Sequence, residues 1–367
     1  MTLLFLLASV LTSCQHGQNP TGSYTWAATA DSLQEATYKK FISANGQYFI
    51  QNTTGNTTFN YWWNAHALDV LVDGYLRTKN PVYKQRMIAL LNGVKTTNGG
   101  ALPNEYYDDM EWMALACLRA HNATGDAAFL EATSLLWTDV QGAWNLSGAN
   151  GGLAWRKTQM DYKNTPANAP AVILAARLYR LNKKAADLEW AKRIYTWLRA
   201  TLVDPATGLV WDGINREGHG QIDKGWKFTY NQGIFIGAAL ELYKITGEQT
   251  YLNDAIHTAD YAIGNFAING ILRPEGKGDA GLFKGILVRY LALLAEEPKL
   301  ATDKSKAYHQ FLRFNAEALY RKGIQRPALL IDANWAQAAA DGTSIDFSTQ
   351  LSGLMLIETA AVLNRYW

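Results

Sequence analysis

The most constraining feature of this sequence is a join between two helical segments that recurs along the chain. In each copy a helix rich in small residues ends, a turn of a few residues follows, and a helix with an aromatic residue begins. These aromatic residues, Tyr83, Phe129, Trp190 and Tyr251, follow one another at intervals of 46 to 61 residues. Such intervals are typical of arrays of helical hairpins. The short turns alternate with longer loops rich in Gly, Asn and aromatic residues, so we expect the long loops to gather at one end of the array.

Hydrophobic periodicity and helix start signals predict twelve helices, and strand signals are sparse. The predicted helices cover residues 27–44, 60–79, 81–96, 105–123, 126–141, 165–182, 184–202, 228–246, 249–267, 280–297, 302–323 and 344–364. The longer loops cover residues 45–59, 97–104, 142–164, 203–227, 268–279 and 324–343.

The ends of this array predict a closed ring. An open stack of hairpins needs polar terminal repeats, but the first predicted helix contains Phe41 and Ile42, and the last contains Leu351, Leu354 and Leu356. Six hairpins closed on themselves form an all-α (α/α)6 toroid, or barrel, with the long loops around one end of a central funnel. Because no linker divides the array, we predict a single (α/α)6 catalytic domain over residues 26–367.

The N-terminal residues predict an exported lipoprotein. An apolar run from Leu3 to Leu11 is too short to span a bilayer as a mature helix. It ends in Leu-Thr-Ser-Cys at residues 11–14, which resembles a bacterial lipobox. We therefore predict a signal peptide over residues 1–14 with Cys14 lipidated, and a tether over residues 15–25. This places the protein in the periplasm or on the cell surface, attached to the membrane only through the lipid.

Composition and charge narrow the class of partner. A formal net charge of +2 argues against nucleic acid and against a polybasic membrane surface. The 13 Trp and 19 Tyr either fill a large helical core or stack on flat, uncharged ligands such as sugars. The 6 His show no close ligand spacing, so we expect neither a metal nor another cofactor. We expect the protein to be a monomer.

Two adjacent carboxylates, Asp108 and Asp109, open the predicted fourth helix within the stretch Asn104-Glu105-Tyr106-Tyr107-Asp108-Asp109. Mutual repulsion and the aromatic neighbours raise the cost of ionising both. The helix dipole stabilises one carboxylate by about 0.3–1 kcal/mol, which leaves the other free to hold a proton. An acid/base pair needs this asymmetry. Taken alone, the pair is more often a helix cap, because Asp is a preferred residue at helix starts.

Further motifs open alternate helices and give the pair its context. They are Tyr61-Trp62-Trp63-Asn64, then Gly151-Gly152-Leu153-Ala154-Trp155, then Tyr162-Lys163-Asn164 with Ala167-Asn168-Ala169-Pro170, then Thr229-Tyr230-Asn231-Gln232-Gly233, and Phe283-Lys284-Gly285. With Tyr-Tyr-Asp-Asp at residues 106–109, the set from the fourth helix onward resembles glycoside hydrolase family 76 in its motifs and their order. This family contains the bacterial endo-α-1,6-mannanases and their fungal cell-wall relatives. The resemblance runs from about residue 26 to the C-terminus.

The resemblance implies an (α/α)6 barrel and retaining, endo-acting cleavage of α-1,6-linked mannan through a covalent glycosyl-enzyme. It implies that Asp108 is the nucleophile and Asp109 the general acid/base. One departure from the family is Ala154, where the family often has a tryptophan beside the one matched by Trp155. We expect this departure to affect subsites or chain-length preference and to leave the acid/base pair unaffected.

Several other residues at this end of the barrel are candidate sugar contacts, with core packing or helix capping as the alternative role. They are Trp62, Trp63, Asn64, Tyr107, Trp155, Asn168, Tyr230, Asn231, Gln232, Lys284 and Arg289. Lys284 and Arg289 are expected either to pair with the two aspartates and tune them or to form ordinary surface ion pairs. Glu105 and Glu111 are alternative acids, of which Glu111 lies one turn deeper and is better explained as structural.

Two alternative functions stay open. A transglycosidase or an exo-acting enzyme on the same fold would share the aspartate pair. A non-catalytic glycan-binding lipoprotein would also need the aromatic residues, but it has no need for two adjacent, mutually repelling acids.

Overall fold

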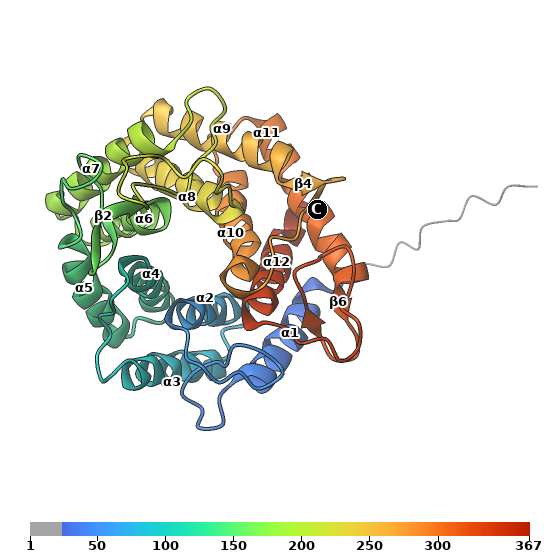
Figure 1. Ribbon diagram of the computed structural model, residues 1–367. Coiled ribbons are helices and arrows are strands. Elements are labelled where there is room, and N and C mark those ends of the chain that lie inside the picture. Colours follow the sequence, from blue (N-terminus) through green and yellow to red (C-terminus); the bar gives the residue numbers. More distant parts are fainter. Residues whose placement is uncertain (1–23) are drawn as a thin grey trace, which may run out of the picture.

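The computed structural model describes residues 24–367, in which twelve α-helices alternate between an inner and an outer ring (Figure 1). The predicted signal peptide, Cys14 and most of the tether lie outside these residues, so the lipoprotein assignment stays a prediction. The inner helices are α2 (Tyr61–Thr78), α4 (Tyr107–Thr124), α6 (Thr165–Asn182), α8 (Thr229–Thr246), α10 (Phe283–Ala295) and α12 (Phe347–Leu363). The outer helices are α1 (Trp26–Phe41), α3 (Pro81–Thr97), α5 (Ala127–Gln141), α7 (Ala185–Leu202), α9 (Gln249–Asn265) and α11 (Thr302–Ala318).

The ring is closed by the last helix. Each inner helix packs against the next, and α12 packs against both α1 and α2 (Figure 1). The predicted (α/α)6 barrel is therefore confirmed. No helix within residues 24–367 combines the length and the apolar character needed to cross a membrane.

The inner helices are buried on nearly all sides, which explains their small and aliphatic residues. Close approach is required between α8 and α10: a Cβ added to Gly233 would lie 2.7 Å from the Cα of Leu287. A Cβ added to Gly237 would lie 2.4 Å from the Tyr290 ring. Outer helices need to bury only one face, and α7, for example, buries Ala191, Ile194, Leu198 and Leu202 along one stripe.

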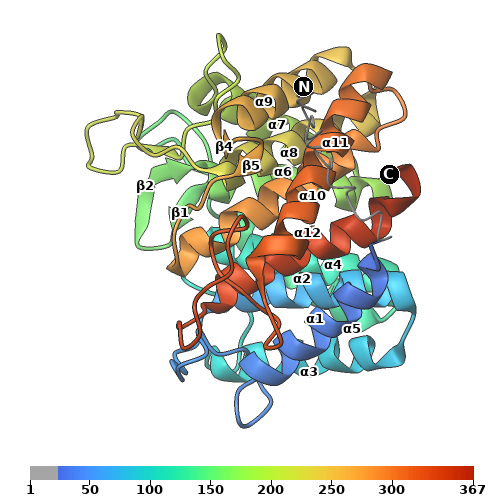
Figure 2. The same cartoon turned by 90° about the vertical axis from the view of Figure 1, so that its right-hand side faces the viewer.

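The two ends of the barrel differ because short turns join each inner helix to the next outer helix. Four of these inner helices end in a left-handed residue, Lys79, Gly125, Lys183 or Gly247, and the outer helix follows within a few residues. The long loops lie at the opposite end. A side view shows β1 and β2 at one end of the barrel and the C-terminus at the other (Figure 2).

The long loops contain short strands, which the sequence pattern did not predict. The strands β1 (Ala154–Arg156), β2 (Gln159–Asn164) and β3 (Gly213–Ile214) form an antiparallel sheet in that order. Two small hairpins pair β4 (Ala267–Ile268) with β5 (Ile271–Leu272), and β6 (Ile324–Gln325) with β7 (Leu330–Ile331). Three short helical turns, η1 (Gly278–Leu282), η2 (Leu319–Gly323) and η3 (Asn364–Tyr366), take up residues predicted as α-helix or loop.

A buried amide side chain fixes the loop that precedes several inner helices. Asn64 accepts a hydrogen bond from the Phe49 N–H (2.7 Å) and donates to the same residue's carbonyl (3.3 Å). Asn168 and Gln232, also the fourth residues of their helices, bind both backbone groups of Leu153 and of Val210 in the same way. These three side chains are fully buried. The structure therefore corrects their expected role as sugar contacts: they hold the loops that surround the candidate site.

Candidate active site

A cleft of about 760 Å³ opens at the end of the barrel where the long loops gather. Its lining combines aromatic rings with acids from separate loops and helix starts. The lining includes Trp62, Tyr106, Asp108, Asp109, Trp112, Trp155, Tyr162, Asp212, Arg216, Trp226, Phe228, Tyr230, Asp279 and Phe283.

Asp108 lies in the first turn of α4 and faces the cleft. Its Oδ1 accepts a hydrogen bond from the Asp109 N–H (3.0 Å), and its Oδ2 accepts one from the Trp155 indole N–H (3.1 Å). Burial raises the pKa of Asp108 to about 7, even though both donors favour the ionised form and lower the pKa.

Asp109 is held in a different electrostatic environment. Burial, the negative charge of Asp108 and that of Asp279 all raise its pKa well above the usual range of an aspartate. Its Oδ2 accepts one hydrogen bond, from the Asn104 amide (3.0 Å). Asp109 therefore keeps its proton when Asp108 has released its own, and the two carboxyls titrate as a coupled pair.

A third buried carboxylate, Asp212, was not anticipated. It accepts hydrogen bonds from the Tyr230 hydroxyl (2.9 Å), the Asn231 amide (3.0 Å), the Tyr162 hydroxyl (3.2 Å) and Arg216 (2.9 Å). Asn231 is fully buried and contacts the cleft residue Asp212, so the structure gives it a supporting role in place of the expected sugar contact. The available signal was an acid in a predicted long loop, Trp211-Asp212-Gly213.

A fourth acid, Asp279 in η1, orients the two consecutive tryptophans of α2. Its Oδ1 accepts a hydrogen bond from the Trp62 indole and another from the Trp63 indole, each 2.9 Å long. Trp62 lines the cleft as expected, whereas Trp63 is buried and reaches the cleft only through Asp279.

Aromatic rings cover two sides of the cleft. Tyr230 and Phe283 stack with their ring centroids 3.9 Å apart and nearly parallel planes. Trp155 lies between Tyr106 and Tyr162, at centroid distances of 5.3 and 5.8 Å. The structure thus places the predicted contacts Trp155 and Tyr230 in the cleft.

Three other predicted contacts lie elsewhere. Tyr107 is buried, and its hydroxyl lies 4.0 Å from the Met160 sulfur. Lys284 donates to the Ala333 carbonyl (2.6 Å) and lies over the Trp335 ring, and burial lowers its pKa to about 7. Arg289 pairs with Asp69 and Asp73 toward the other end of the barrel. The expectation that Lys284 or Arg289 pairs with the two catalytic candidates is wrong.

The two alternative acids, Glu105 and Glu111, do not line the cleft. Glu111 is fully buried one turn below Asp108, and burial followed by the charge of Asp108 raises its pKa well above the usual range. Glu105 is exposed and accepts a hydrogen bond from Thr158.

Ala154, where the family often has tryptophan, is buried in β1 and does not line the cleft. Within residues 24–367, no three His, Cys, Asp or Glu side chains lie close enough to hold a metal ion.

Comparison with known proteins identifies the family of this chain. The model of glycosyl hydrolase family 76 matches residues 25–366. The structure of the GH76A alpha-1,6-mannanase from Salegentibacter sp. HEL1_6 is similar, with a TM-score of 0.89 and 46% sequence identity over 92% of this chain and 99% of that one. An inactive variant of that protein, with two consecutive aspartates replaced by asparagine, has been solved in complex with α-1,6-mannotriose at the same TM-score of 0.89 and 45% identity; the match covers 92% of this chain and 99% of that one.

Fungal relatives are more distant. A mannan endo-1,6-alpha-mannosidase from Candida glabrata is 26% identical over 261 residues, which are 64% of this chain and 58% of the relative. The chain thus spans less than two thirds of the length of that relative.

The raised pKa of Asp109 predicts that the stability difference between wild type and an Asp109 variant changes with pH. The unfolded chain releases this proton near pH ~3.9, whereas the folded protein keeps it to higher pH. The folded state then binds more protons, so the unfolding free energy falls as pH rises above about 4 and up to the folded pKa. Asp109→Asn removes this penalty, and we expect its stability relative to wild type to increase from pH 5 to pH 8.

Urea denaturation at the two pH values measures this difference. Glu131→Gln provides the matched control, because it makes the same acid-to-amide change at an exposed position outside the cleft. A wild type that gains stability over Asp109→Asn between pH 5 and pH 8 would contradict the assigned protonation.

Proposed function

The chain belongs to glycosyl hydrolase family 76, and we propose that this glycoside hydrolase cleaves α-1,6-mannosidic bonds within a mannan backbone, with retention of anomeric configuration. The observation that carries the proposal is the pair Asp108 and Asp109, two adjacent half-buried carboxyls with unequal proton affinity in an aromatic-lined cleft. The similar Salegentibacter enzyme is an α-1,6-mannanase, and its inactive variant has two consecutive aspartates replaced.

In the first step the Asp108 carboxylate attacks the anomeric carbon of the mannosyl unit. A bond forms between its oxygen and this carbon while the bond to the glycosidic oxygen breaks, and Asp109 donates its proton to the departing oxygen. The leaving chain departs as a neutral alcohol. The other part of the substrate remains as an ester of Asp108.

The electrostatics of the pair support the second step. The negative charge of Asp108 is one of the causes that raise the pKa of Asp109. Esterification neutralises Asp108, so the pKa of Asp109 falls at the stage when a base is required. Asp109 then takes a proton from water, the water oxygen attacks the anomeric carbon, and the Asp108 carboxylate leaves.

The cleft is suited to a neutral polymer. Trp62, Trp155 and the stacked Tyr230–Phe283 pair offer aromatic surfaces for sugar rings. Asp212 is held by four donors, two on each oxygen, which fix this negatively charged group in the wall of the cleft. Such a combination of apolar walls with a few fixed polar groups is characteristic of small-molecule sites.

Digestion of debranched α-1,6-mannan tests the proposed function. We expect oligosaccharides of mixed length early in the reaction, and proton NMR of fresh products should show the α-anomer first. Release of mannose alone would indicate an exo-acting enzyme, and products longer than the substrate would indicate a transglycosidase. Binding without any cleavage would indicate a glycan-binding protein, and an initial β-anomer would exclude retention.

Two single substitutions separate the proposed roles. Asp109→Asn removes the proton donor and should lower kcat/KM on mannan about 10²–10⁴-fold. With an aryl α-mannoside whose leaving group needs no proton, the same variant should form the glycosyl-enzyme at a rate close to that of wild type. Asp108→Asn removes the nucleophile and should lose activity on both substrates.

Steady-state and burst kinetics on mannan and on the aryl substrate measure this contrast. If the aryl substrate restores the Asp108→Asn variant and not Asp109→Asn, the two roles must be exchanged. Equal loss in both variants on both substrates would remove the assignment of separate roles.

A further inference from the structure

A second cavity, of about 580 Å³, opens at the end of the barrel opposite the cleft. Its lining comes from the later turns of the inner helices: Arg119, for example, follows Asp109 by ten residues on α4, or about 15 Å along the helix axis. Trp112 lines both the cleft and this cavity, so the two spaces lie on opposite sides of one layer of side chains. We call it the rear cavity.

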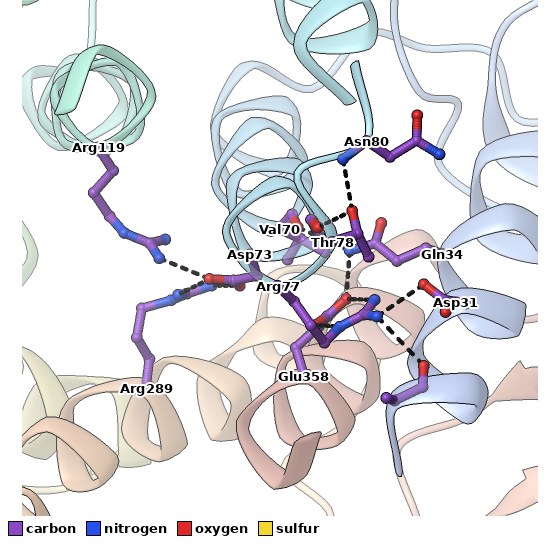
Figure 3. A network of polar contacts seen from close by, with 12 residues as sticks. Asp31, Gln34, Val70, Asp73, Arg77, Thr78, Asn80, Arg119, Arg289 and Glu358 are labelled. Carbon is purple, nitrogen blue, oxygen red and sulfur yellow. Dashed lines mark hydrogen bonds and ion pairs between the residues drawn. The ribbon is translucent and has the colours of Figure 1, made fainter. Parts of the chain in front are cut away.

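Four charged side chains from three inner helices form an ion-pair cluster in the rear cavity. Arg289 binds Asp69 (2.9 Å) and Asp73 (2.7 Å), and Arg119 binds the same two acids, with 2.7 Å to Asp73. Figure 3 shows Arg119 and Arg289 reaching the Asp73 carboxylate from two different helices. Burial opposes ionisation of Asp69, but the two guanidinium groups outweigh it and hold its pKa at about 2. Asp69 therefore stays ionised at neutral pH.

The charges of the rear cavity cancel. Among the described residues, its charged lining consists of four carboxylates and four guanidinium groups. The charged groups outside the four-residue cluster are paired as well: Glu358 with Arg77, both Arg177 and Arg180 with Glu241, and Glu296 with Arg365 (Figure 3 shows the first pair). A charged ligand would have to break one of these pairs or leave its own charge uncompensated, which is unfavourable in a buried site.

His66 provides an unused hydrogen-bonding group in this neutral space. It is 4% exposed, lines the rear cavity, and neither ring nitrogen has a hydrogen-bond partner among the described residues. Burial lowers its pKa to about 3, so the ring is neutral and offers one donor and one acceptor. An unpartnered buried polar group of this kind is costly unless a ligand or water satisfies it.

We propose that the rear cavity binds a short neutral saccharide, of one or two sugar units. Its volume falls in the range of small-molecule pockets, ~300–1,000 Å³. Trp112 and Tyr290 supply aromatic surface, His66 and the paired arginines and carboxylates supply hydrogen bonds to hydroxyl groups, and the balanced charge favours an uncharged ligand. The half-exposed Leu76, Leu181 and Val362 form an apolar mouth.

The proposal goes beyond the function of the cleft, so the test must separate the two sites. Isothermal titration uses α-1,6-mannobiose and, separately, mannose as probes. The host protein is the double variant Asp108→Asn with Asp109→Asn, which prevents turnover. We expect at least one of the two sugars to bind a second site in addition to the cleft.

Two variants address the rear cavity and one addresses the cleft. His66→Phe keeps the ring shape and removes its hydrogen bonds, and Leu181→Trp narrows the mouth from a surface position. Each should weaken the second site at least tenfold and leave cleft binding unchanged. Trp155→Ala should weaken the cleft alone, so that loss of cleft binding is recognised independently of the rear cavity.

The proposal is overturned if neither sugar occupies a second site at concentrations up to about 10 mM, or if the second site is insensitive to both rear-cavity variants. It is overturned equally if inorganic phosphate binds and the same two variants abolish that binding, because the site would then select an anion. His66 lies against the Trp62 and Trp112 rings, at centroid distances of 5.5 and 4.6 Å. Thermal unfolding of His66→Phe without ligand serves as the folding control, since an apolar ring between these aromatic side chains should leave the fold at least as stable.

Discussion

The repulsion between two adjacent, half-buried carboxyls at the start of one helix is the interaction on which the site depends. Asp108 and Asp109 share a helical turn, and burial raises the pKa of both. Their difference comes from their partners: Asp108 accepts from a backbone N–H and from Trp155, whereas Asp109 faces the negative charges of Asp108 and Asp279. This arrangement does not stabilise the fold, because raised carboxyl pKa values lower the free energy of unfolding as pH rises. Its role is therefore in the chemistry of the site.

The barrel supplies what the pair needs. The closed ring gathers long loops from different hairpins around the helix that starts with these acids, and Trp155, Asp212 and Asp279 all come from such loops. Buried amides such as Asn168 and Gln232 fix those loops to the inner helices through backbone hydrogen bonds. The loops thus hold the donor to Asp108 and the acids of the cleft in place, although they contain little regular structure.

The sequence predicted the helices and the closure of the ring because both depend on local patterns. Short joins, small inner-helix residues and apolar ends are visible along the chain. The same locality made Asp108 and Asp109 visible. The sequence did not predict Asp212 and Asp279 as site residues. Their roles depend on contacts between loops distant in sequence, and the spacing of residues along the chain does not indicate such contacts.

Some residues predicted as sugar contacts are of a suitable type, but their side chains point away from the cleft. Asn64 and Asn168 belong to the motifs that open their helices, but an amide can face a loop as easily as a cleft, and both face a loop. Arg289 lies six residues after Phe283, or about 9 Å deeper along α10, which brings it to the rear cavity. The rise of 1.5 Å per residue along α10 is therefore sufficient to place Arg289 away from the cleft.

The central claim is that Asp108 forms the covalent bond while Asp109 handles the proton. Trapping with a fluorinated α-mannosyl fluoride, which forms the ester quickly and hydrolyses it slowly, followed by mass spectrometry of proteolytic peptides, tests it directly. We predict one mannosyl adduct per protein, located on Asp108. An adduct on Asp109, or none at a concentration of reagent that inactivates the enzyme, would contradict this account.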